Sequence, residues 1–256
     1  MSDKPLKGKI AVVTGASAGI GQACATALVA DGWTTVFVGR DATKLSAVVA
    51  ALPEAQRARA ETAVCDVTNA DDVKALFDGV ASRHGRIDLL FNNAGVNQTP
   101  VTPDELGADE WRKVVGTNLD GAFYCLSNAF RIMRHQSPQG GRIINNGSIS
   151  AHTPRPCSIA YAASKSAITG LTRGAALDGR ALNIAVGQID IGNVASAMTE
   201  RMAAGVLQAD GSIRAEARMD MSGVASTFMA MVNLPLESNI FTVTVMATGM
   251  PYVGRG

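Results

Sequence analysis

Tyr161 and Lys165 stand four residues apart in the segment SIAYAASK, and their side chains have complementary chemistry. If this segment is helical, the phenol and the ammonium group project from one face, one turn apart. An isolated phenol has a pKa of about 10, and a neighbouring positive charge stabilises the phenolate and lowers that pKa. Such a phenol can exchange a proton with the oxygen of an alcohol or a ketone. The alternative is a tyrosine packed inward beside a solvated lysine, and the pair alone does not exclude it.

Two further polar residues, Ser148 and Asn118, interrupt apolar segments. Ser148 follows the apolar run 142–145 outside any Gly-x-Ser-x-Gly motif, and no histidine and acid stand at a useful spacing. We therefore interpret its hydroxyl as a hydrogen-bond donor rather than a hydrolytic nucleophile. Asn118 lies in a stretch, 108–135, whose apolar residues recur at helical steps. Because asparagine competes for helical backbone hydrogen bonds, it predicts a kink or a site there, with a solvated surface asparagine as the alternative.

A glycine-rich turn follows the first predicted strand, the apolar and β-branched run 9–14. Gly15, Gly19 and Gly21 are spaced Gly-x-x-x-Gly-x-Gly, and a helical segment begins directly after them. Such a turn lets the backbone approach a pyrophosphate, whose charge the helix N-terminus stabilises with its free amides and dipole. The spacing departs from the Gly-x-Gly-x-x-Gly dinucleotide fingerprint, and glycine turns also serve plain packing.

The ends of the next three predicted strands indicate how a dinucleotide would be held. Arg40 follows the second strand, where an arginine can pair with a 2′-phosphate, so we expect NADP rather than NAD. The alternative is that Arg40 only caps a surface loop. Asp66 follows the third strand, either as a residue near the next helix cap or as an acceptor for an adenine amino group. The string Asn-Asn-Ala-Gly at 92–95 predicts a tight turn with a close backbone approach.

Strands and helices alternate along the chain, which predicts an α/β fold: one Rossmann-like, doubly wound parallel sheet of about seven strands with helices on both faces. We expect strands at 9–14, 34–38, 61–65, 87–91, 142–145, 181–189 and 240–246, and helices at 22–29, 42–51, 69–83, 108–135, 158–178 and 219–232. The polar, methionine-rich region 194–218 lacks strong periodicity, and we expect a substrate lid there. No linker or repeat divides the chain, so residues 1–256 are predicted to form a single domain.

Composition limits the classes of function. With 256 residues, 47% of them hydrophobic and 18% charged, the chain can bury a large core. A net charge of +1 without a basic run gives no reason to expect binding to nucleic acid or to a membrane surface. Four widely spaced cysteines predict buried thiols rather than a metal site or a redox pair. The polar N-terminus and the lack of a long apolar run lead us to expect a cytoplasmic protein.

With the glycine turn, Asn-Asn-Ala-Gly, Ser148 and the Tyr161–Lys165 pair assembled in this order, the chain resembles the single-domain branch of the short-chain dehydrogenase/reductase family. The resemblance covers nearly the whole chain. It implies an NAD(P)-dependent oxidoreductase that transfers hydride between nicotinamide and a carbonyl or secondary alcohol substrate. It also implies four catalytic residues: Asn118 to anchor a water that relays protons, Ser148 to bind the substrate oxygen, Tyr161 as general acid and base, and Lys165 to lower the tyrosine pKa and hold the nicotinamide ribose.

The resemblance further implies a set of cofactor-binding residues: Gly15, Ser17, Gly19, Ile20, Gly21, Arg40, Asp66, Val67, Asn93, Ala94, Gly95, Tyr161, Lys165, Gly192 and Ser196. The chain departs from the family pattern after the sixth strand, where Ile191 replaces a proline that would fix φ beside the nicotinamide. Ser196 stands where the family often has threonine. Ala18 stands where NADP-preferring members often have Arg or Lys, so Arg40 is the main argument for NADP.

Other functions and features remain open at this point. A dinucleotide-binding sensor or scaffold without turnover is the alternative function, and an epimerase or dehydratase would need more sequence after the sixth strand. The loop 151–157 and the lid should line the substrate pocket, where His152 and Arg155 could favour an anionic or polar substrate unless they are solvated loop residues. The apolar faces of the helices predicted at 108–135 and 158–178 suggest subunit contacts, and the resemblance implies a homotetramer or homodimer.

Overall fold

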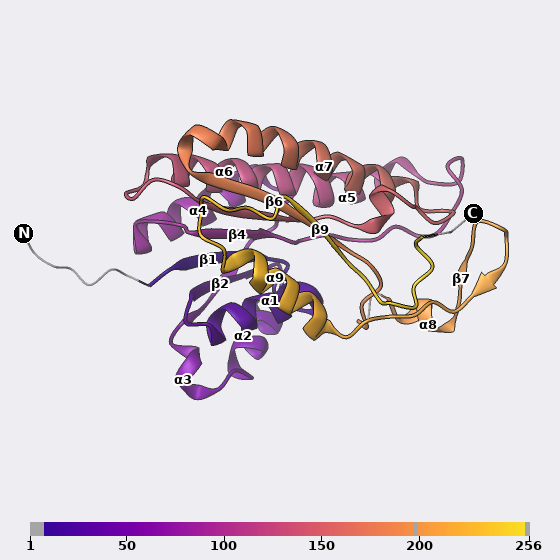
Figure 1. Cartoon of the computed structure of the whole chain (residues 1–256), viewed down its shortest axis with the longest axis horizontal. Helices are drawn as coiled ribbons and strands as arrows, with labels where there is room; N and C mark the ends of the chain where they lie inside the picture. Colours follow the sequence, from indigo (N-terminus) through magenta and orange to yellow (C-terminus); the bar gives the residue numbers. More distant parts are fainter. Residues whose placement is uncertain (1–7, 197–198, 254–256) are drawn as a thin grey trace, which may run out of the picture.

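Seven parallel strands form the central sheet in the order β3-β2-β1-β4-β5-β6-β9 (Figure 1). The computed structural model describes residues 8–196 and 199–253, so the predicted polar N-terminus and two residues of the predicted lid lie outside the described residues. The strands are β1 (Ile10–Thr14), β2 (Thr34–Gly39), β3 (Ala60–Val64), β4 (Leu89–Asn92), β5 (Gly141–Asn146), β6 (Ile184–Ile191) and β9 (Thr242–Val245). The predicted doubly wound parallel sheet is confirmed.

Helices cover both faces of this sheet. In Figure 1, α4, α5, α6 and α7 lie on one face, and α1, α2 and α9 lie on the other. Their bounds are α1 (Gly19–Ala30), α2 (Ala42–Ala50), α3 (Glu54–Arg57), α4 (Ala70–His84), α5 (Ala108–Val115), α6 (Gly121–His135), α7 (Ile159–Gly179), α8 (Glu200–Ala204) and α9 (Met221–Val232).

Side chains of β1 alternate between the two hydrophobic cores. Ile10 and Val12 pack with α4 and α6, whereas Ala11 and Val13 pack with α1 and α9. All four residues are at most 1% exposed. A strand that is buried on both faces needs an uninterrupted apolar run, and for that reason the segment IAVVT was recognisable in the sequence.

The helix predicted at 108–135 contains an irregular turn at its centre. Residues Gly116–Asp120 form a π-helical turn, η1, between α5 and α6. Asn118 lies in this turn and is only 2% exposed. The prediction of an irregularity at Asn118 is therefore confirmed, and its interpretation as a solvated surface residue is wrong. Single π turns within helices are frequent at functional sites.

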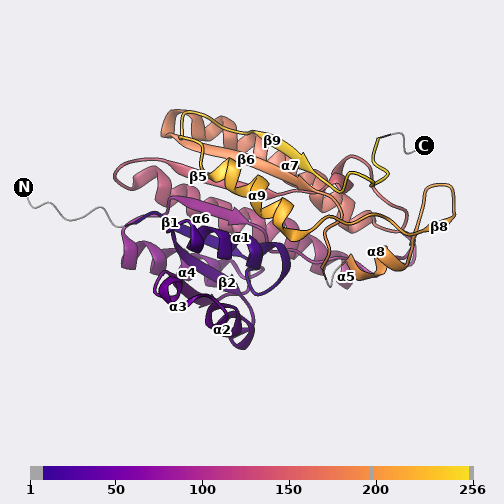
Figure 2. The same cartoon turned by 60° about the horizontal axis from the view of Figure 1, so that its bottom comes forward.

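Two other predictions need correction. The sixth strand begins at Ile184 rather than at 181, because Arg180–Leu182 form a 3₁₀ turn (η3) and Asn183 takes the left-handed conformation with φ 56°. The segment 194–218 contains an unpredicted antiparallel ribbon, β7 (Val206–Leu207) with β8 (Ile213–Arg214), after the short helix α8. Figure 2 shows α8 and the ribbon beyond the carboxyl ends of the central strands.

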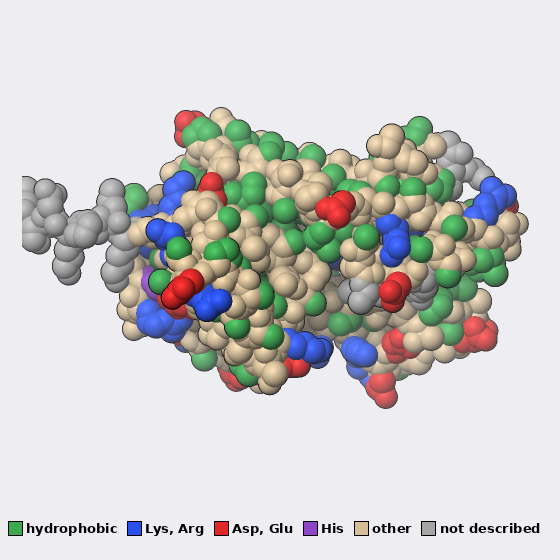
Figure 3. Space-filling view, turned by 90° about the horizontal axis from the view of Figure 1, so that it is seen from below, with side chains coloured by type: hydrophobic (Ala, Val, Ile, Leu, Met, Phe, Trp, Pro, Cys, Tyr) green, Lys and Arg blue, Asp and Glu red, His purple; other side chains and the backbone are tan. Residues whose placement is uncertain are grey.

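Acidic and basic side chains are intermingled on the face drawn in Figure 3, and hydrophobic side chains are scattered between them. This mixture agrees with the net charge of +1. Among the described residues, no helix combines the length and the apolar character needed to cross a lipid bilayer.

Candidate active site

A cavity of about 730 Å³ opens at the carboxyl ends of the central strands. It brings together three of the four predicted catalytic residues, Ser148, Tyr161 and Lys165, and every predicted cofactor residue. The cofactor residues that line it are Gly15, Ser17, Gly19, Ile20, Gly21, Arg40, Asp66, Val67, Asn93, Ala94, Gly95, Gly192 and Ser196, together with Tyr161 and Lys165. Asn118 does not line the cavity and is buried behind it.

The glycine turn after β1 leaves the N-terminus of α1 open to an anion. The N-cap residue Ala18 makes no side-chain capping bond, whereas Asp41, Asn69 and Asp220 cap α2, α4 and α9 with their side chains. No acidic residue occupies the first turn of α1 either. The amides at this helix end are therefore available to a phosphate group, and the residues present fit the pyrophosphate of a dinucleotide.

Close packing explains why residue 21, in the first turn of α1, is a glycine. A Cβ atom on Gly21 would lie 2.3 Å from the carbonyl oxygen of Gly15 and 2.5 Å from Nδ2 of Asn93. Gly15 itself has φ +66°, a conformation that only glycine adopts without strain. The turn after β1 and the turn after β4 are thus pressed together, and this contact brings two predicted cofactor motifs to one end of the cavity.

A hydrogen-bond network fixes the Asn-Asn-Ala-Gly turn. Oγ1 of Thr14 accepts from the amides of Asn93 (2.8 Å) and Ala94 (2.9 Å), and Nδ2 of Asn93 donates to the carbonyl of Thr14 (2.8 Å). Nδ2 of Asn146 donates to Oδ1 of Asn93 (2.7 Å). The ends of β1, β4 and β5 are held in one rigid arrangement. The part played by Asn146 was not predicted, because its partner lies 53 residues away in the sequence.

Lys165 is buried at the same strand ends. Its Nζ donates to the carbonyl oxygen of Asn146 (2.7 Å) and lies 5.7 Å from the ring centroid of Tyr161. Only 4% of Lys165 is exposed, and this burial lowers its pKa to about 8, while the charge of Asp190 acts in the opposite direction. Asn146 therefore links Lys165 to the Asn-Asn-Ala-Gly turn. Its backbone carbonyl accepts from Lys165, and its side-chain amide donates to Asn93.

Tyr161 and Ser148 lie together on the cavity lining. Burial raises the pKa of the Tyr161 phenol, while a hydrogen bond from Ser148 and the charge of Arg155 oppose that rise. Oγ of Ser148 also accepts from the amide of Ser150 (3.1 Å), which caps the short turn η2 (Ile149–Ala151) and fixes the hydroxyl in place. The predicted influence of Lys165 on the tyrosine pKa stays a prediction.

Asn118 uses its side chain to fasten the loop after β4. Its Oδ1 accepts from the amide of Val96 (2.8 Å), and its Nδ2 donates to the carbonyl of Val96 (3.0 Å) and to Oγ of Ser164 (3.2 Å). Ser164 lies next to Lys165 on α7. The side chain thus ties the loop that follows the cofactor turn to the helix that carries Tyr161 and Lys165.

Gln98 holds the start of α7 and was not predicted. Its Oε1 accepts from the amides of Ala160 (2.7 Å) and Tyr161 (3.0 Å), and its Nε2 donates to the carbonyl of Cys157 (3.2 Å). Ser158, the N-cap residue of α7, makes no capping bond with its side chain. Gln98 satisfies these helix amides from a loop some 60 residues earlier, and no sequence pattern of α7 points to it.

Arg40 and Asp66 lie at the opposite end of the cavity, after β2 and β3. Arg40 is exposed, and its charge contributes to the lowered pKa of Asp66, whose main cause is the amide of Thr68. Oδ1 of Asp66 accepts from the amide (3.0 Å) and the hydroxyl (2.8 Å) of Thr68. Because both residues line the cavity, both are placed to contact a ligand bound there.

The replacement of the family proline by Ile191 is accommodated by sheet pairing. β6 continues through Ile191, which pairs with Val245 of β9, and the amide of Gly192 donates to the carbonyl of Val245 (2.9 Å). A Cβ on Gly192 would lie 2.6 Å from Cβ of Met246. The neighbouring strand restrains the backbone here, in place of a proline ring.

The loop 151–157 divides its residues between the cavity and the surface. Arg155, Pro156 and Cys157 line the cavity, and the interpretation of Arg155 as a solvated loop residue is wrong because its side chain is only 16% exposed. His152 does not line the cavity; its ring nitrogen lies 3.4 Å from Asp190, and its side chain is 46% exposed.

The prediction of buried thiols holds for Cys24, Cys65 and Cys125, whereas Cys157 is half-buried. In the part of the chain that the structure describes, no three His, Cys, Asp or Glu side chains form a group able to hold a metal ion.

Comparison with known proteins agrees with this geometry. The model of the short chain dehydrogenase family matches residues 9–206, most of the chain. The chain belongs to the short-chain dehydrogenase family. A 3beta-hydroxysteroid dehydrogenase of Mediterraneibacter gnavus is 36% identical over 222 residues, which cover 87% of this chain and 79% of that protein.

Solved structures of similar proteins include complexes with both nicotinamide dinucleotides. A metagenomic short-chain oxidoreductase in complex with NADP is 29% identical, with a TM-score of 0.76 over 94% of this chain and 97% of that chain. The 3-ketoacyl-(acyl-carrier-protein) reductase of Brucella melitensis complexed with NADH has a TM-score of 0.81 over 94% of this chain and 97% of that chain, and its 22% identity shows the fold alone. The short-chain dehydrogenase described here is thus an oxidoreductase of a family that uses nicotinamide dinucleotides.

Proposed function

We propose that this short-chain dehydrogenase transfers hydride between a nicotinamide dinucleotide and a carbonyl or secondary alcohol substrate, with Tyr161 as general acid and base. The observation that carries the proposal is that Tyr161, Ser148 and Lys165 share one cavity with the open N-terminus of α1. When bound, the dinucleotide supplies the hydride, which no side chain can provide. The glycine turn and the Asn-Asn-Ala-Gly turn would hold it.

Each residue of the site has a part in this proposal. Ser148 and Tyr161 donate hydrogen bonds to the substrate oxygen, where negative charge develops during reduction. Tyr161 gives its proton to that oxygen in reduction and takes it back in oxidation. Lys165 favours the phenolate that remains, because its charged form lies close to the tyrosine ring. A proton relay through a water anchored by Asn118 completes the proposal.

The decisive experiment follows absorbance at 340 nm while purified protein is mixed with NADPH or NADH and a panel of ketones, aldehydes and quinones. The variant Tyr161→Phe keeps the ring but loses the proton, so we expect its turnover to fall by at least about 100-fold. Cofactor binding, measured by the change in nucleotide fluorescence, should stay nearly unchanged. Near-normal turnover by this variant would contradict the role of Tyr161, and tight cofactor binding without turnover of any compound would favour the sensor or scaffold.

NADP is the cofactor that we favour. Arg40 follows β2 at the cavity, and Gly39 before it leaves room for a phosphate. The acid nearest to the end of β2, Asp41, does not line the cavity; its side chain accepts from the amide of Lys44 as the N-cap of α2, so it is not placed to bind both ribose hydroxyls of NAD. The same absorbance assay tests the preference: kcat/KM should be higher with NADPH than with NADH, and the opposite order would contradict it.

We also propose a homodimer or homotetramer. Among the described residues, four large apolar side chains are exposed on the helices of one face of the sheet: Trp111 (39%) on α5, Phe123 (49%) on α6, and Ile159 (42%) and Leu177 (60%) on α7. Exposed apolar groups gathered on neighbouring helices are typical of surfaces that another subunit covers.

A further inference from the structure

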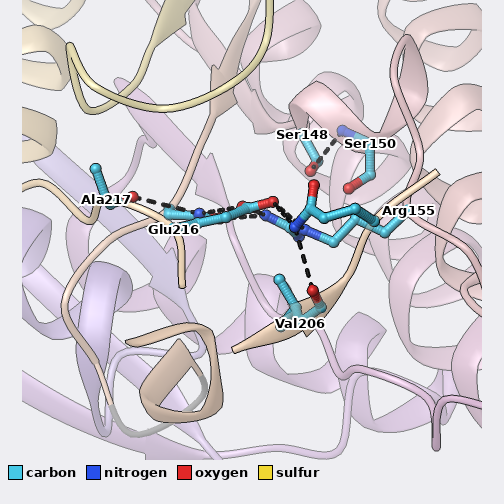
Figure 4. A network of polar contacts seen from close by, with 8 residues as sticks. Ser148, Ser150, Arg155, Val206, Glu216 and Ala217 are labelled. Carbon is cyan, nitrogen blue, oxygen red and sulfur yellow. Dashed lines mark hydrogen bonds and ion pairs between the residues drawn. The ribbon is translucent and has the colours of Figure 1, made fainter. Parts of the chain in front are cut away.

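Arg155 and Glu216 form a buried ion pair at the cavity, and Figure 4 shows their side chains pointing toward one another. Nε of Arg155 donates to Oε1 of Glu216 (3.3 Å), and Nη2 donates to Oε2 and to Oδ1 of Asn193 (2.7 Å). Nδ2 of Asn193 and Nε2 of Gln208 donate to the same carboxylate, at 2.7 and 3.0 Å. Three segments far apart in the sequence therefore meet at one carboxylate.

Burial of this pair needs a functional explanation. The side chain of Glu216 is 1% exposed and that of Arg155 16% exposed. Removing two charges from water costs about as much free energy as their attraction returns, so a buried ion pair is a weak source of stability. Its donors and acceptors are, however, fixed in direction, because Asn193 and Gln208 hold the carboxylate from two sides. Such a pair is suited to presenting a hydrogen-bonding group in a defined position.

The guanidinium of Arg155 keeps one nitrogen available for a ligand. Within residues 8–196 and 199–253, Nη1 of Arg155 has no hydrogen-bond partner. This nitrogen is also not fully enclosed by protein atoms. Arg155 itself lines the cavity. A two-hydrogen donor group is thus held at the cavity by a carboxylate behind it.

The lining around Arg155 combines apolar side chains with uncharged polar ones, such as Ser150, Ser158 and Asn193. The residues that the loop after β5 and the segment 194–218 contribute to the cavity include six with little or no polarity: Pro156, Cys157, Met202, Val206, Leu207 and Ile213. The other charged residues among the described lining are Lys165, beside Tyr161, and Arg40 with Asp66 at the far end. A substrate reaching from Ser148 and Tyr161 toward the segment 194–218 therefore meets apolar and uncharged polar side chains, with the guanidinium of Arg155 as the charged group there.

On the basis of the proposed function, we propose that the pair Arg155–Glu216 selects an uncharged substrate with a second oxygen. The substrate would be a largely apolar ketone or secondary alcohol, and Nη1 of Arg155 would donate to a further neutral acceptor, such as a hydroxyl, ketone, ester or amide oxygen. Glu216 would oppose a substrate that carries a carboxylate at that position, because its own negative charge offsets the charge of Arg155. Arg155 would thus bind substrate, and Glu216 would set its charge preference.

The test compares matched pairs of methyl ketones of graded chain length that end either in a methyl ester or in the free carboxylate. For the wild type, kcat/KM should be higher for the esters, mainly through a lower KM. Glu216→Gln keeps a hydrogen-bonding group but removes the negative charge, so the ratio of kcat/KM for acid over ester should rise by at least roughly tenfold. A wild-type preference for the acids, or a ratio that Glu216→Gln leaves unchanged, would overturn the proposal.

Asp210→Asn is the matched control, because it removes a carboxylate of the same segment that is paired with Arg214 at the surface, where the side chains are 46% and 66% exposed. Its acid-to-ester ratio should equal that of the wild type, and a tenfold rise there would overturn the assignment to Glu216. If Glu216→Gln does not fold, Arg155→Gln provides the second test. It should abolish the advantage of the ester over a plain methyl ketone of equal length, and an unchanged advantage would overturn the proposal.

Failure of the proposed function gives a different result. In that case no ketone is reduced at all. Calorimetry can still measure how tightly the ester and the acid bind to the cofactor complex, and this comparison reports the charge preference. If the wild type binds the ester more tightly than the acid, and Glu216→Gln removes or reverses this difference in affinity, the role of the pair is supported without turnover. If carbonyl compounds are turned over but neither member of any pair acts as substrate or inhibitor, the proposal is wrong.

Discussion

Asp190 is a carboxylate at the end of β6 with no exposed surface. Its Oδ1 accepts from Nε2 of Gln188 (2.7 Å), and a Cβ on Gly147 would lie 2.0 Å from that oxygen. The end of β6 therefore carries a carboxylate beside the end of β5, where Lys165 donates to Asn146, and the ring of His152 lies 3.4 Å from this carboxylate. This charge raises the pKa of Lys165 against the lowering effect of burial, which brings the pKa to about 8. Asp190 thus helps to keep the lysine charged near neutral pH.

Asp190→Asn should move the alkaline limit of activity to lower pH. Activity that needs charged Lys165 is lost as the pH rises through the lysine pKa, which is about 8 in the wild type. Without the neighbouring carboxylate that pKa falls further, so the midpoint of the alkaline limb should fall below the wild-type value. The measurement is the pH profile of kcat/KM. Asp109→Asn, at a fully exposed carboxylate, is the control and should leave the profile in place; an upward shift for Asp190→Asn would contradict the interpretation.

The chemically active residues were predictable because short local patterns carry them. Tyr161 and Lys165 follow helical spacing, and Ser148 directly follows a recognisable strand. Gln98 and Glu216 escaped prediction, since each acts through partners about 60 residues away that only the folded chain brings near. Isolated polar residues of this kind carry no sequence signal of their own. Arg155 was predicted at the pocket, but its buried carboxylate partner was not.

At the scale of elements, the contact between the turns after β1 and β4 can be tested by Gly21→Ala. The added Cβ would lie 2.3 Å from the carbonyl oxygen of Gly15, so the two turns must move apart. We expect a loss of roughly 1–3 kcal/mol in the free energy of unfolding and weaker cofactor binding. Urea unfolding and a fluorescence titration with NADPH measure the two effects.

Gly170→Ala is the matched control for this substitution. Gly170 also lies in a helix, α7, but a Cβ there meets no atom within 4 Å. Alanine should therefore be neutral or should raise the free energy of unfolding by up to about 1 kcal/mol, with cofactor binding unchanged. Equal losses for the two variants would show that helix propensity, and not the contact between the turns, decides the outcome.

Helices and strands were predictable where the burial of apolar side chains sets the local sequence pattern. The inner strands β1 and β4 are buried on both faces, so each appears as an apolar run that ends at glycine or polar residues. The ribbon of β7 and β8 was missed because each strand has only two residues and no alternation to detect. The start of β6 was misplaced because 181–183 are compatible with a strand by composition, whereas the chain turns there through η3 and Asn183.

At the scale of the whole molecule, Phe123→Asp tests the proposed subunit contact. Phe123 is 49% exposed on α6, and burying a carboxylate between subunits is unfavourable. We expect a smaller assembly, seen as a lower mass by light scattering after size exclusion, with an unchanged far-ultraviolet circular dichroism spectrum. Val64→Asp is the control, because Val64 is 62% exposed on the edge strand β3, away from these helices. Dissociation by Val64→Asp alone would place the contact elsewhere.

The general architecture could be predicted from the alternation of strands and helices along the sequence. Which helices share a face was not readable from the sequence, because amphipathic patterns show that a helix is covered but not by what. The pairing of α1 with α9 is an example: their residues, such as Leu28 and Phe228, meet in one core although some 200 positions separate them.

The strand order also has a consequence for synthesis of the protein. β1 lies at the centre of the sheet and is made first; one edge pairs with β2, which follows soon after, but the other edge pairs with β4 (Leu89–Asn92). Until β4 has left the ribosome, the nascent chain carries an apolar strand with an unpaired edge, which is a template for association with other chains. Among the strands of the central sheet, β1 therefore waits through the longest stretch of synthesis for its second partner, and its edge is covered when β4 pairs with it.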